Sequence, residues 1–291
     1  MGESSPTVAR KSLAAQSWHR YKKSKLAMLG LALMIFIALV AIFAGVLADY
    51  ETQAVDQNMS QKLLRPGPGH WFGTDQYGRD LYARVIHGAR YSLSAAVACT
   101  LLSLVGGIFI GAQAGYYGGL VDNALMRVMD IFFAIPALLM AIAIVSALGV
   151  GLVNLVLAMT ISNIPQFARI VRAAVMTIKG EEFVEAARAC GSNNLRILRK
   201  HILPNVIGPI IVQATLSVGR ILLMMSSLSF IGLGAEKPMP EWGALLADGK
   251  EQMRYYPYLI IIPGIAIILT VMAFNLVGDG LRDALDPKQK K

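Results

Sequence analysis

Long apolar blocks separated by short polar segments dominate this chain. A helix needs about 20 mostly apolar residues to cross the hydrocarbon core of a bilayer. Unpaired backbone polar groups are costly in lipid, so apolar blocks of that length should be helical. The pattern therefore predicts an all-α integral membrane protein with six transmembrane helices, at roughly 26–48, 91–114, 124–148, 151–172, 205–230 and 257–278.

The first apolar block invites comparison with a signal peptide. It follows a basic lead and ends in a short sequence that a peptidase could cut. The apolar region of a signal peptide has about 7–15 residues, and the block at 26–48 is longer than that. We therefore interpret it as a retained membrane anchor.

Composition and charge agree with a membrane protein. Hydrophobic residues make up 55% of the chain and charged residues 15%, against about 25% charged in soluble domains. The net charge is +9, but the basic residues lie in short segments between apolar blocks, so no nucleic acid is expected as a partner. Cys99 and Cys190 lack CxxC spacing, and we expect neither a disulfide nor a metal site from them.

The basic residues predict the orientation in the membrane. Most of them precede 26, lie within 169–200 or follow 281, and cytoplasmic segments carry an excess of Lys and Arg. Both termini are then cytoplasmic. The predicted division is a cytoplasmic N-terminal segment (1–25), a first transmembrane helix (26–48), an extracytoplasmic segment (49–90), a core of five transmembrane helices (91–280) and a cytoplasmic tail (281–291).

Small residues recur at four-residue spacing in the second predicted span. Gly107, Gly111 and Gly115 follow this spacing, which lets helix backbones approach closely. We favour packing within one subunit over a dimer contact.

The third and fourth predicted spans contain features that disturb a straight helix. Pro136 and Pro165 each remove a helical hydrogen bond and favour a kink. Asp122, Arg127 and Asp130 mark the start of the third span, where local ion pairing is favoured over a proton relay.

Polar residues make the fourth predicted span the least apolar. Polar groups inside a bilayer face other helices or a watery cavity. Interhelical hydrogen bonding and a translocation path lined by the fourth and fifth spans are equally good interpretations. The candidate residues lining such a path are Asn154, Thr160, Asn163, Gln213 and Arg220.

Arg220 is a charged residue within the fifth predicted span. It follows Pro204 by about 24 Å of helix, which places it near the outer interface. Its side chain is expected to reach lipid head groups or to form a structural ion pair. The alternative is that it faces a central cavity and meets a substrate carboxylate.

The segment 181–204 is too charged to span a membrane. Phe183, Ala186, Ala187 and Cys190 follow helical spacing, and Gly191 suits the left-handed position that ends a helix. Ser192 or Asn193 can cap a second helix, whose apolar stripe is Leu195, Leu198 and Ile202. The sequence predicts two short amphipathic helices that need lipid head groups or a partner surface to cover their apolar face.

The same segment resembles the EAA loop of ABC importer permeases. Glu185-Ala186-Ala187 is followed after three residues by Gly191 and later by Leu203-Pro204. His201 departs from the general pattern, which has an aliphatic residue there, but a histidine is familiar in the peptide and nickel branch. The resemblance implies coupling to an ATPase through Glu185, Ala186, Ala187, Gly191, Leu195, Leu203 and Pro204.

Other stretches resemble the same branch. Residues 72–80 look like its GTDxxGRD segment, 228–243 like its outer loop and 275–287 like its C-terminal signature. The likeness covers nearly the whole chain from about residue 18. It points to the C-type permease subunit of dipeptide/oligopeptide importers, a group that includes nickel and glutathione systems.

The resemblance implies a type I ABC importer permease fold with cytoplasmic coupling helices, spanning the bacterial cytoplasmic (inner) membrane several times in contact with membrane lipid. It also implies a complex with a second related permease (a heterodimer), two ABC ATPase subunits and an extracytoplasmic substrate-binding protein. Peptides fit the resemblance best as cargo. Nickel or a nickel chelate, and glutathione, are the alternatives.

The chain itself lacks the motifs of ATP-driven or hydrolytic chemistry. It has no GxxxxGK[ST] phosphate loop, no HExxH and no GxSxG. We therefore expect no catalytic residue, cofactor or metal in this chain, with ATP bound by the partner ATPases. A membrane enzyme or receptor would need convergent catalytic groups within the spans. A remote alternative, an ion-gradient-driven carrier, would need carboxylates deep in the membrane.

Overall fold

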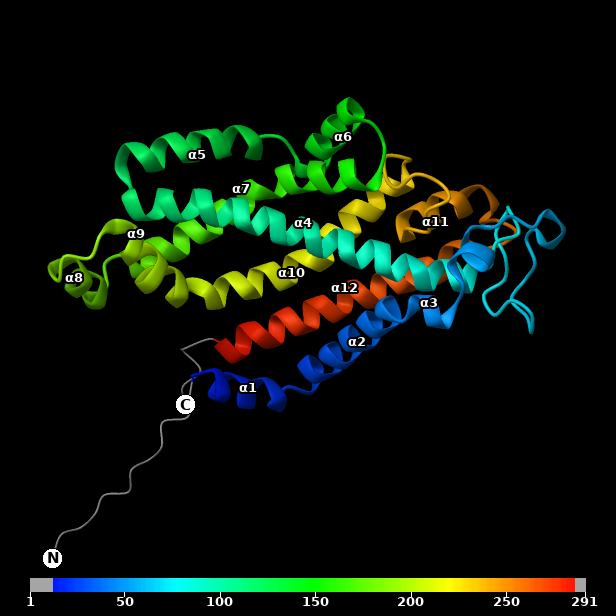
Figure 1. The fold of residues 1–291 in the computed structure, drawn as a ribbon, viewed down its shortest axis with the longest axis horizontal. Coiled ribbons are helices and arrows are strands. Elements are labelled where there is room, and N and C mark those ends of the chain that lie inside the picture. Colours follow the sequence, from blue (N-terminus) through cyan, green and yellow to red (C-terminus); the bar gives the residue numbers. More distant parts are fainter. Residues whose placement is uncertain (1–12, 286–291) are drawn as a thin grey trace, which may run out of the picture.

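The computed structural model describes residues 13–285, which form a bundle of helices with no strand in that range (Figure 1). Its elements are α1 (Leu13–Lys23), α2 (Lys25–Ile42), α3 (Ala44–Leu47), η1 (Tyr50–Val55), η2 (Met59–Gln61), α4 (Leu81–Tyr117), α5 (Gly119–Phe133), α6 (Ala137–Leu148), α7 (Leu152–Ile178), α8 (Glu182–Ala189), α9 (Asn194–Arg196), η3 (Ile197–Ile202), α10 (Leu203–Phe230), α11 (Trp242–Gly249), η4 (Lys250–Gln252) and α12 (Tyr258–Leu285).

The long helices run roughly along one axis, so the bundle has two ends. The helices α1, α8 and α9 and the last turns of α12 gather at one end (Figure 1). Residues 49–80 and α11 lie at the other end (Figure 1). The segments that charge predicts to be cytoplasmic therefore share one end. The orientation of that end in the cell stays a prediction, and residues 1–12 and 286–291 lie outside the described residues.

Within the described residues, four helical segments are long and apolar enough to cross a membrane, and the α5–α6 pair makes five if it counts as one span. These segments are α2, α4, residues 194–230 and α12. The sequence predicts six spans. The remaining predicted span corresponds to α7, which has 27 residues and a length of about 40 Å. It is long enough to cross a membrane, but its polar side chains make it less apolar than the other segments. Its role as a span stays a prediction.

The predicted third span is broken rather than kinked. The helices α5 and α6 meet at an angle of 82°, and Pro136 is the residue that caps the start of α6. Pro165, in contrast, lies inside the uninterrupted α7. A proline lacks the backbone N–H that a helix interior needs, and only at Pro136 does the chain change direction this sharply.

The glycines of α4 allow it to pack closely against α7, and the two helices run side by side (Figure 1). A Cβ atom at Gly107 would lie 2.3 Å from Cβ of Phe167. At Gly111 it would lie 2.3 Å from the carbonyl oxygen of Ala168. The contact that these glycines make is thus within one chain, as favoured from their spacing.

Replacing Gly111 with valine should destabilise the protein by about 1–3 kcal/mol, because the new side chain must push the α7 backbone away. Thermal unfolding of the detergent-solubilised chain measures this. The control is Gly264→Val on α12, where an added Cβ atom would have no neighbouring atom within 4 Å. Equal shifts for the two variants would contradict the packing argument.

Ion pairs join α5 to α7. Nε and Nη2 of Arg172 donate to the two carboxylate oxygens of Asp122, at 2.5 and 2.6 Å. Arg169 contacts Asp130 at 2.6 Å. The expectation of local pairing between Arg127 and Asp130 is wrong, because the partners of both acidic residues come from the neighbouring helix.

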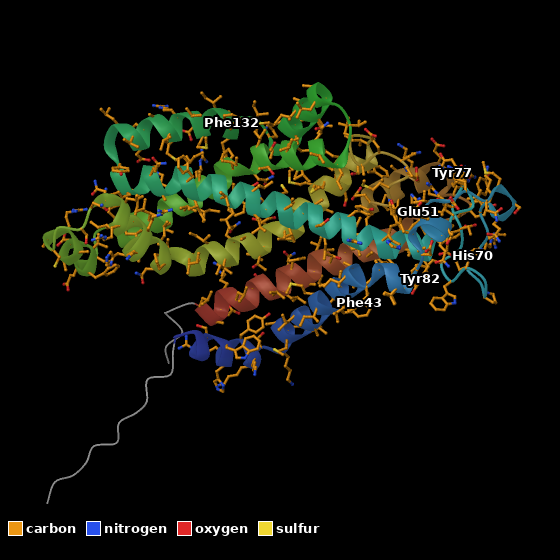
Figure 2. The ribbon with its side chains drawn as sticks, in the orientation of Figure 1. Phe43, Glu51, His70, Tyr77, Tyr82 and Phe132 are labelled. Atoms are coloured by element: carbon orange, nitrogen blue, oxygen red, sulfur yellow. The ribbon has the colours of Figure 1, made fainter. Side chains whose placement is uncertain are left out.

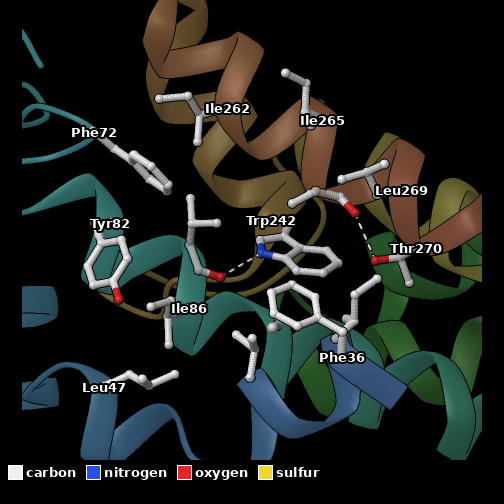
Figure 3. A pocket seen from close by; sticks show the side chains of 15 residues that line it. Phe36, Leu47, Phe72, Tyr82, Ile86, Trp242, Ile262, Ile265, Leu269 and Thr270 are labelled. Atoms are coloured by element: carbon white, nitrogen blue, oxygen red, sulfur yellow. Dashed lines mark hydrogen bonds between the residues drawn. The ribbon is translucent and has the colours of Figure 1, made fainter. Parts of the chain in front are cut away.

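An apolar cavity of about 470 Å³ lies among α2, α4, α11 and α12 (Figure 3). Trp242 lines it, and its indole N–H donates to the carbonyl oxygen of Val85 at 2.9 Å. The hydroxyl of Thr270 donates to the carbonyl oxygen of Ala266 at 2.8 Å. Because these polar groups are already paired, the cavity offers little to a charged cargo, and a path for such a cargo is expected in another part of the bundle.

Candidate functional site

The segment 181–204 folds as two helices around a glycine turn, at the end of the bundle. Helix α8 carries acidic residues in its first turn and Arg188 in its last, an arrangement that favours the helix dipole. Gly191 has φ +76°, the left-handed conformation expected after a helix. Asn193 caps α9 by accepting a hydrogen bond from the backbone N–H of Arg196 at 2.8 Å. The predicted turn and the Asn193 cap are both confirmed.

One residue that the sequence analysis missed anchors this unit. Val184 is completely buried in a cluster that includes Ile197 and Ile202. The hydroxyl of Tyr116, at the end of α4, donates to Oδ1 of Asn194 at 2.8 Å. No spacing rule singles out Val184, because its neighbour Phe183 fits a helical stripe equally well. These contacts hold the unit on the bundle as a fixed projection.

The opposite face of the unit is exposed. Phe183 is 41% exposed and Leu195 59% exposed, and Glu185 and Ala186 are exposed beside them. No ion pair of Glu185 is found among residues 17–285. We call Phe183, Glu185, Ala186, Cys190 and Leu195 the coupling surface, after the role that the resemblance predicts. It combines small residues, apolar side chains and an exposed carboxylate.

The coupling surface is connected to a long helix. The helical residues 194–230 form one segment that includes α9, η3 and α10. Leu203 and Pro204 stand in the first turn of α10, which continues η3 without a break. Ala187 and Leu203 pack against the buried cluster around Val184. A partner that displaced the unit would therefore displace the start of α10.

A second group of predicted residues meets between α7 and α10. Nη2 of Arg220 lies 3.5 Å from Oδ1 of Asn163 on α7 and 3.4 Å from Oγ of Ser217. Nε2 of Gln213 donates to the same Ser217 hydroxyl at 3.4 Å. We call Asn163, Gln213, Ser217 and Arg220 the polar cluster. It joins three of the five residues predicted to line a path.

The other two predicted path residues have local structural contacts. Nδ2 of Asn154 donates to the carbonyl oxygens of Leu148 and Gly149, each at 3.1 Å, and closes the turn between α6 and α7. Thr160 is buried against α4, where its carbonyl oxygen accepts from Ser103 at 3.1 Å. The structure does not bring these two residues into the polar cluster.

A cavity of about 450 Å³ adjoins the polar cluster. Gln213 lines it, and so do Ile170 of α7 and Leu216 of α10. Arg282, in the last turn of α12, also lines it. Unlike the apolar cavity beside Trp242, this one has an amide and a guanidinium group in its wall.

A charged cluster occupies the other end of the bundle. Nε of Arg79 lies 2.7 Å from Oδ2 of Asp75, and its Nη2 lies 3.2 Å from Oδ2 of Asp248. Arg84 lies 3.5 Å from each of the same two carboxylates. All four side chains are buried. We call these four residues, with the more exposed Lys237, the outer ion cluster, after the orientation that the basic residues predict.

The outer ion cluster ties the GTDxxGRD segment to α11. Nζ of Lys237 lies 2.7 Å from Oδ1 of Asp248, and this contact raises the pKa of Lys237. The guanidinium of Arg79 stacks on the ring of Tyr77 at 4.5 Å. Figure 2 shows Tyr77 and His70 at the end of the bundle formed by residues 49–80. Two stretches far apart in the sequence thus meet at this end of the bundle.

Buried Glu241 supports the same region. Its carboxylate accepts from the backbone N–H groups of Gly243 and Ala244, each at 2.9 Å, and from Oγ of Ser92 at 3.2 Å. Burial raises the pKa of Glu241. This side chain caps α11 and fixes it to α4.

These features define a helical membrane protein with an exposed helical unit at one end of the bundle and a buried charged cluster at the other. The family described as "Binding-protein-dependent transport system inner membrane component" matches residues 107–291. "N-terminal TM domain of oligopeptide transport permease C" matches residues 12–66. The chain therefore belongs to the family of binding-protein-dependent transport system inner membrane components.

Individual relatives cover almost the whole chain. A dipeptide transport system permease protein of Alkalihalophilus pseudofirmus is 45% identical over 275 residues, which are 94% of this chain and 90% of that one. A glutathione transport system permease protein of Escherichia coli is 43% identical over the same shares. This degree of identity over the full length agrees with the resemblance seen in the motifs.

Solved structures show the fold. A methionine ABC transporter in an inward-facing conformation matches with a TM-score of 0.56 and 20% identity, over 70% of this chain and 97% of that one. An amino acid ABC transporter matches with a TM-score of 0.52 and 17% identity, over 68% and 92%. The chain has the fold of type I ABC importer permeases, as the sequence predicts.

Proposed function

We propose that this chain forms half of the translocation pathway of an ATP-driven importer for di- and oligopeptides. The observation that supports this cargo is the 45% identity, along 94% of the chain, to a permease named for dipeptide transport. The second relative is named for glutathione, which is itself a short peptide. Both names therefore point to the same chemistry: a backbone amide with ionised ends.

The complex would contain a second related permease subunit, two ABC ATPase subunits and an extracytoplasmic substrate-binding protein. The coupling surface supports the ATPase contact, because Phe183 and Leu195 are exposed apolar residues at the end of the bundle. The outer ion cluster would hold the cap on which the binding protein docks. The chain would lie in the bacterial inner membrane, surrounded by lipid, with both termini in the cytoplasm.

Coupling would follow from the connection between the coupling surface and α10. When ATP closes the ATPase subunits, the displaced unit would carry the start of α10 with it, since residues 194–230 are one helical segment. The polar cluster, on α10 and α7, would then change its exposure from one side of the membrane to the other. The chain contributes this motion and the lining of the path, while the partner subunits bind and hydrolyse ATP.

Cargo identity is tested with the complete complex in proteoliposomes. The binding protein is supplied outside and ATP inside, and uptake is followed for a labelled dipeptide, labelled glutathione and radioactive nickel. The proposal predicts ATP-dependent uptake of the dipeptide that excess unlabelled peptide suppresses and nickel does not. Uptake of nickel without peptide uptake would overturn it, and uptake of glutathione alone would narrow the cargo to that tripeptide.

A further inference from the structure

Helix lengths place Arg220 nearer to the middle of a bilayer than to its outer surface. It precedes the last residue of α10, Phe230, by about 15 Å of helix. Its contact Asn163 follows the first residue of α7, Leu152, by about 16 Å. The hydrocarbon core is about 30 Å thick, so both estimates place the pair near its middle.

No carboxylate of residues 17–285 lies within ion-pair distance of Arg220. Its hydrogen bonds are to neutral oxygens, of Asn163 at 3.5 Å and Ser217 at 3.4 Å. Both hydrogen bonds use Nη2, and no partner for Nε or Nη1 is found within the same range. A charged side chain inside a membrane span is costly, and such residues pair with an opposite charge or line a substrate pathway.

The surroundings of Arg220 lead toward the cytoplasmic end. The residue itself is exposed on the surface of this single chain, so the described residues leave its guanidinium group uncovered. Gln213 lies on the same face of α10, about 10 Å before Arg220 and toward the start of the helix. Gln213 lines the cavity of about 450 Å³. Arg282 stands in the wall of that cavity. The route therefore has two positively charged groups, the guanidinium of Arg220 and that of Arg282, and the amide of Gln213 lies between them.

We infer that Arg220 binds the carboxylate of the peptide cargo during its passage. This inference rests on the proposed function and adds the group that recognises the cargo. A guanidinium donates charge-assisted hydrogen bonds to a carboxylate, and the N–H groups of Nε and Nη1 are available for this. Asn163 and Ser217 hold Nη2 and so fix the orientation of the guanidinium group.

The test compares two cargoes that differ only in this group. Uptake by the reconstituted complex is measured for a dipeptide with a free C-terminal carboxylate and for its C-terminal amide, each at a concentration that saturates the binding protein. Arg220→Gln should lower uptake of the acid roughly tenfold, equivalent to about 1.4 kcal/mol, and change uptake of the amide less than about twofold. Arg220→Lys keeps the charge but loses the fixed planar donor geometry of the guanidinium group, so its loss of uptake should be intermediate.

A second variant covers the case in which Arg220→Gln does not assemble. Asn163→Asp puts a carboxylate within 3.5 Å of the guanidinium and supplies the missing counterion from within the chain. It should compete with the cargo and selectively lower uptake of the acid. The control is Arg127→Gln, which removes an exposed arginine from α5 and should leave the ratio of acid to amide uptake unchanged.

The outcomes separate the two proposals. If wild-type complex takes up neither peptide, the proposed function fails and the role of Arg220 fails with it. If wild-type complex takes up the acid but the variants lower both cargoes equally, only the role of Arg220 is wrong, and its counterion belongs to the partner permease or to a lipid phosphate. Unchanged uptake of both cargoes by Arg220→Gln would also overturn it.

Discussion

Replacing Arg79 with methionine should destabilise the protein by about 3–5 kcal/mol, the usual result of breaking a buried ion pair by removing one partner. Asp75 and Asp248 would stay buried without their nearest buried cation, which contacts them at 2.7 and 3.2 Å. Arg84 cannot replace it, because its own contacts to them are 3.5 Å long and it also donates to the carbonyl oxygen of Ala54. Thermal unfolding should shift down by about 10 °C.

Lys237→Met is the matched control for this cluster. The Lys237 side chain is 61% exposed although it contacts the same Asp248, and exposed ion pairs contribute about 0–1 kcal/mol. The two variants remove one cation each from one cluster and differ in burial. If they lower the unfolding temperature equally, burial does not govern the strength of the outer ion cluster.

Replacing Glu185 with lysine should leave the chain folded but reduce ATP-driven uptake at least tenfold. The side chain is exposed, so its loss costs at most about 1 kcal/mol through the dipole of α8. At an interface, however, reversal of a paired charge costs about 2–5 kcal/mol. Uptake of labelled dipeptide by proteoliposomes measures the effect. Glu251→Lys, a charge reversal at an exposed position of the other end, should retain most of the uptake.

Hydropathy predicted most of the helices but not the full length of each. The span predicted at 91–114 lies inside α4, which begins ten residues earlier, at Leu81. Arg84 and His87 made the first turns of α4 look like part of a polar loop. Both are buried because residues 48–54 supply backbone carbonyl oxygens to them, Ala54 for Arg84 and Ala48 for His87. A hydropathy window cannot detect partners that come from a distant loop.

The candidate site was only partly predictable, because some of its contacts are local in the sequence and others join distant segments. The glycine turn at Gly191 and the cap at Asn193 follow from local backbone chemistry, and the sequence predicted both. The meeting of Arg220 with Asn163, or of Arg79 with Asp248, joins residues on different helices or loops. The sequence analysis singled out Arg220 and Asn163 as polar residues of the spans and Arg79 as part of a motif, but only the packing of the helices shows which residues meet.

The exposed unit at α8 and α9 is the central element of the proposed coupling, and ATP hydrolysis tests it most directly. In the complete reconstituted complex, peptide-loaded binding protein should raise the ATPase rate of the wild type, and Glu185→Lys should lose that stimulation while the chain's own unfolding temperature stays nearly unchanged. Full stimulation and full uptake in Glu185→Lys, or peptide uptake driven by an ion gradient without ATP, would contradict coupling at this surface.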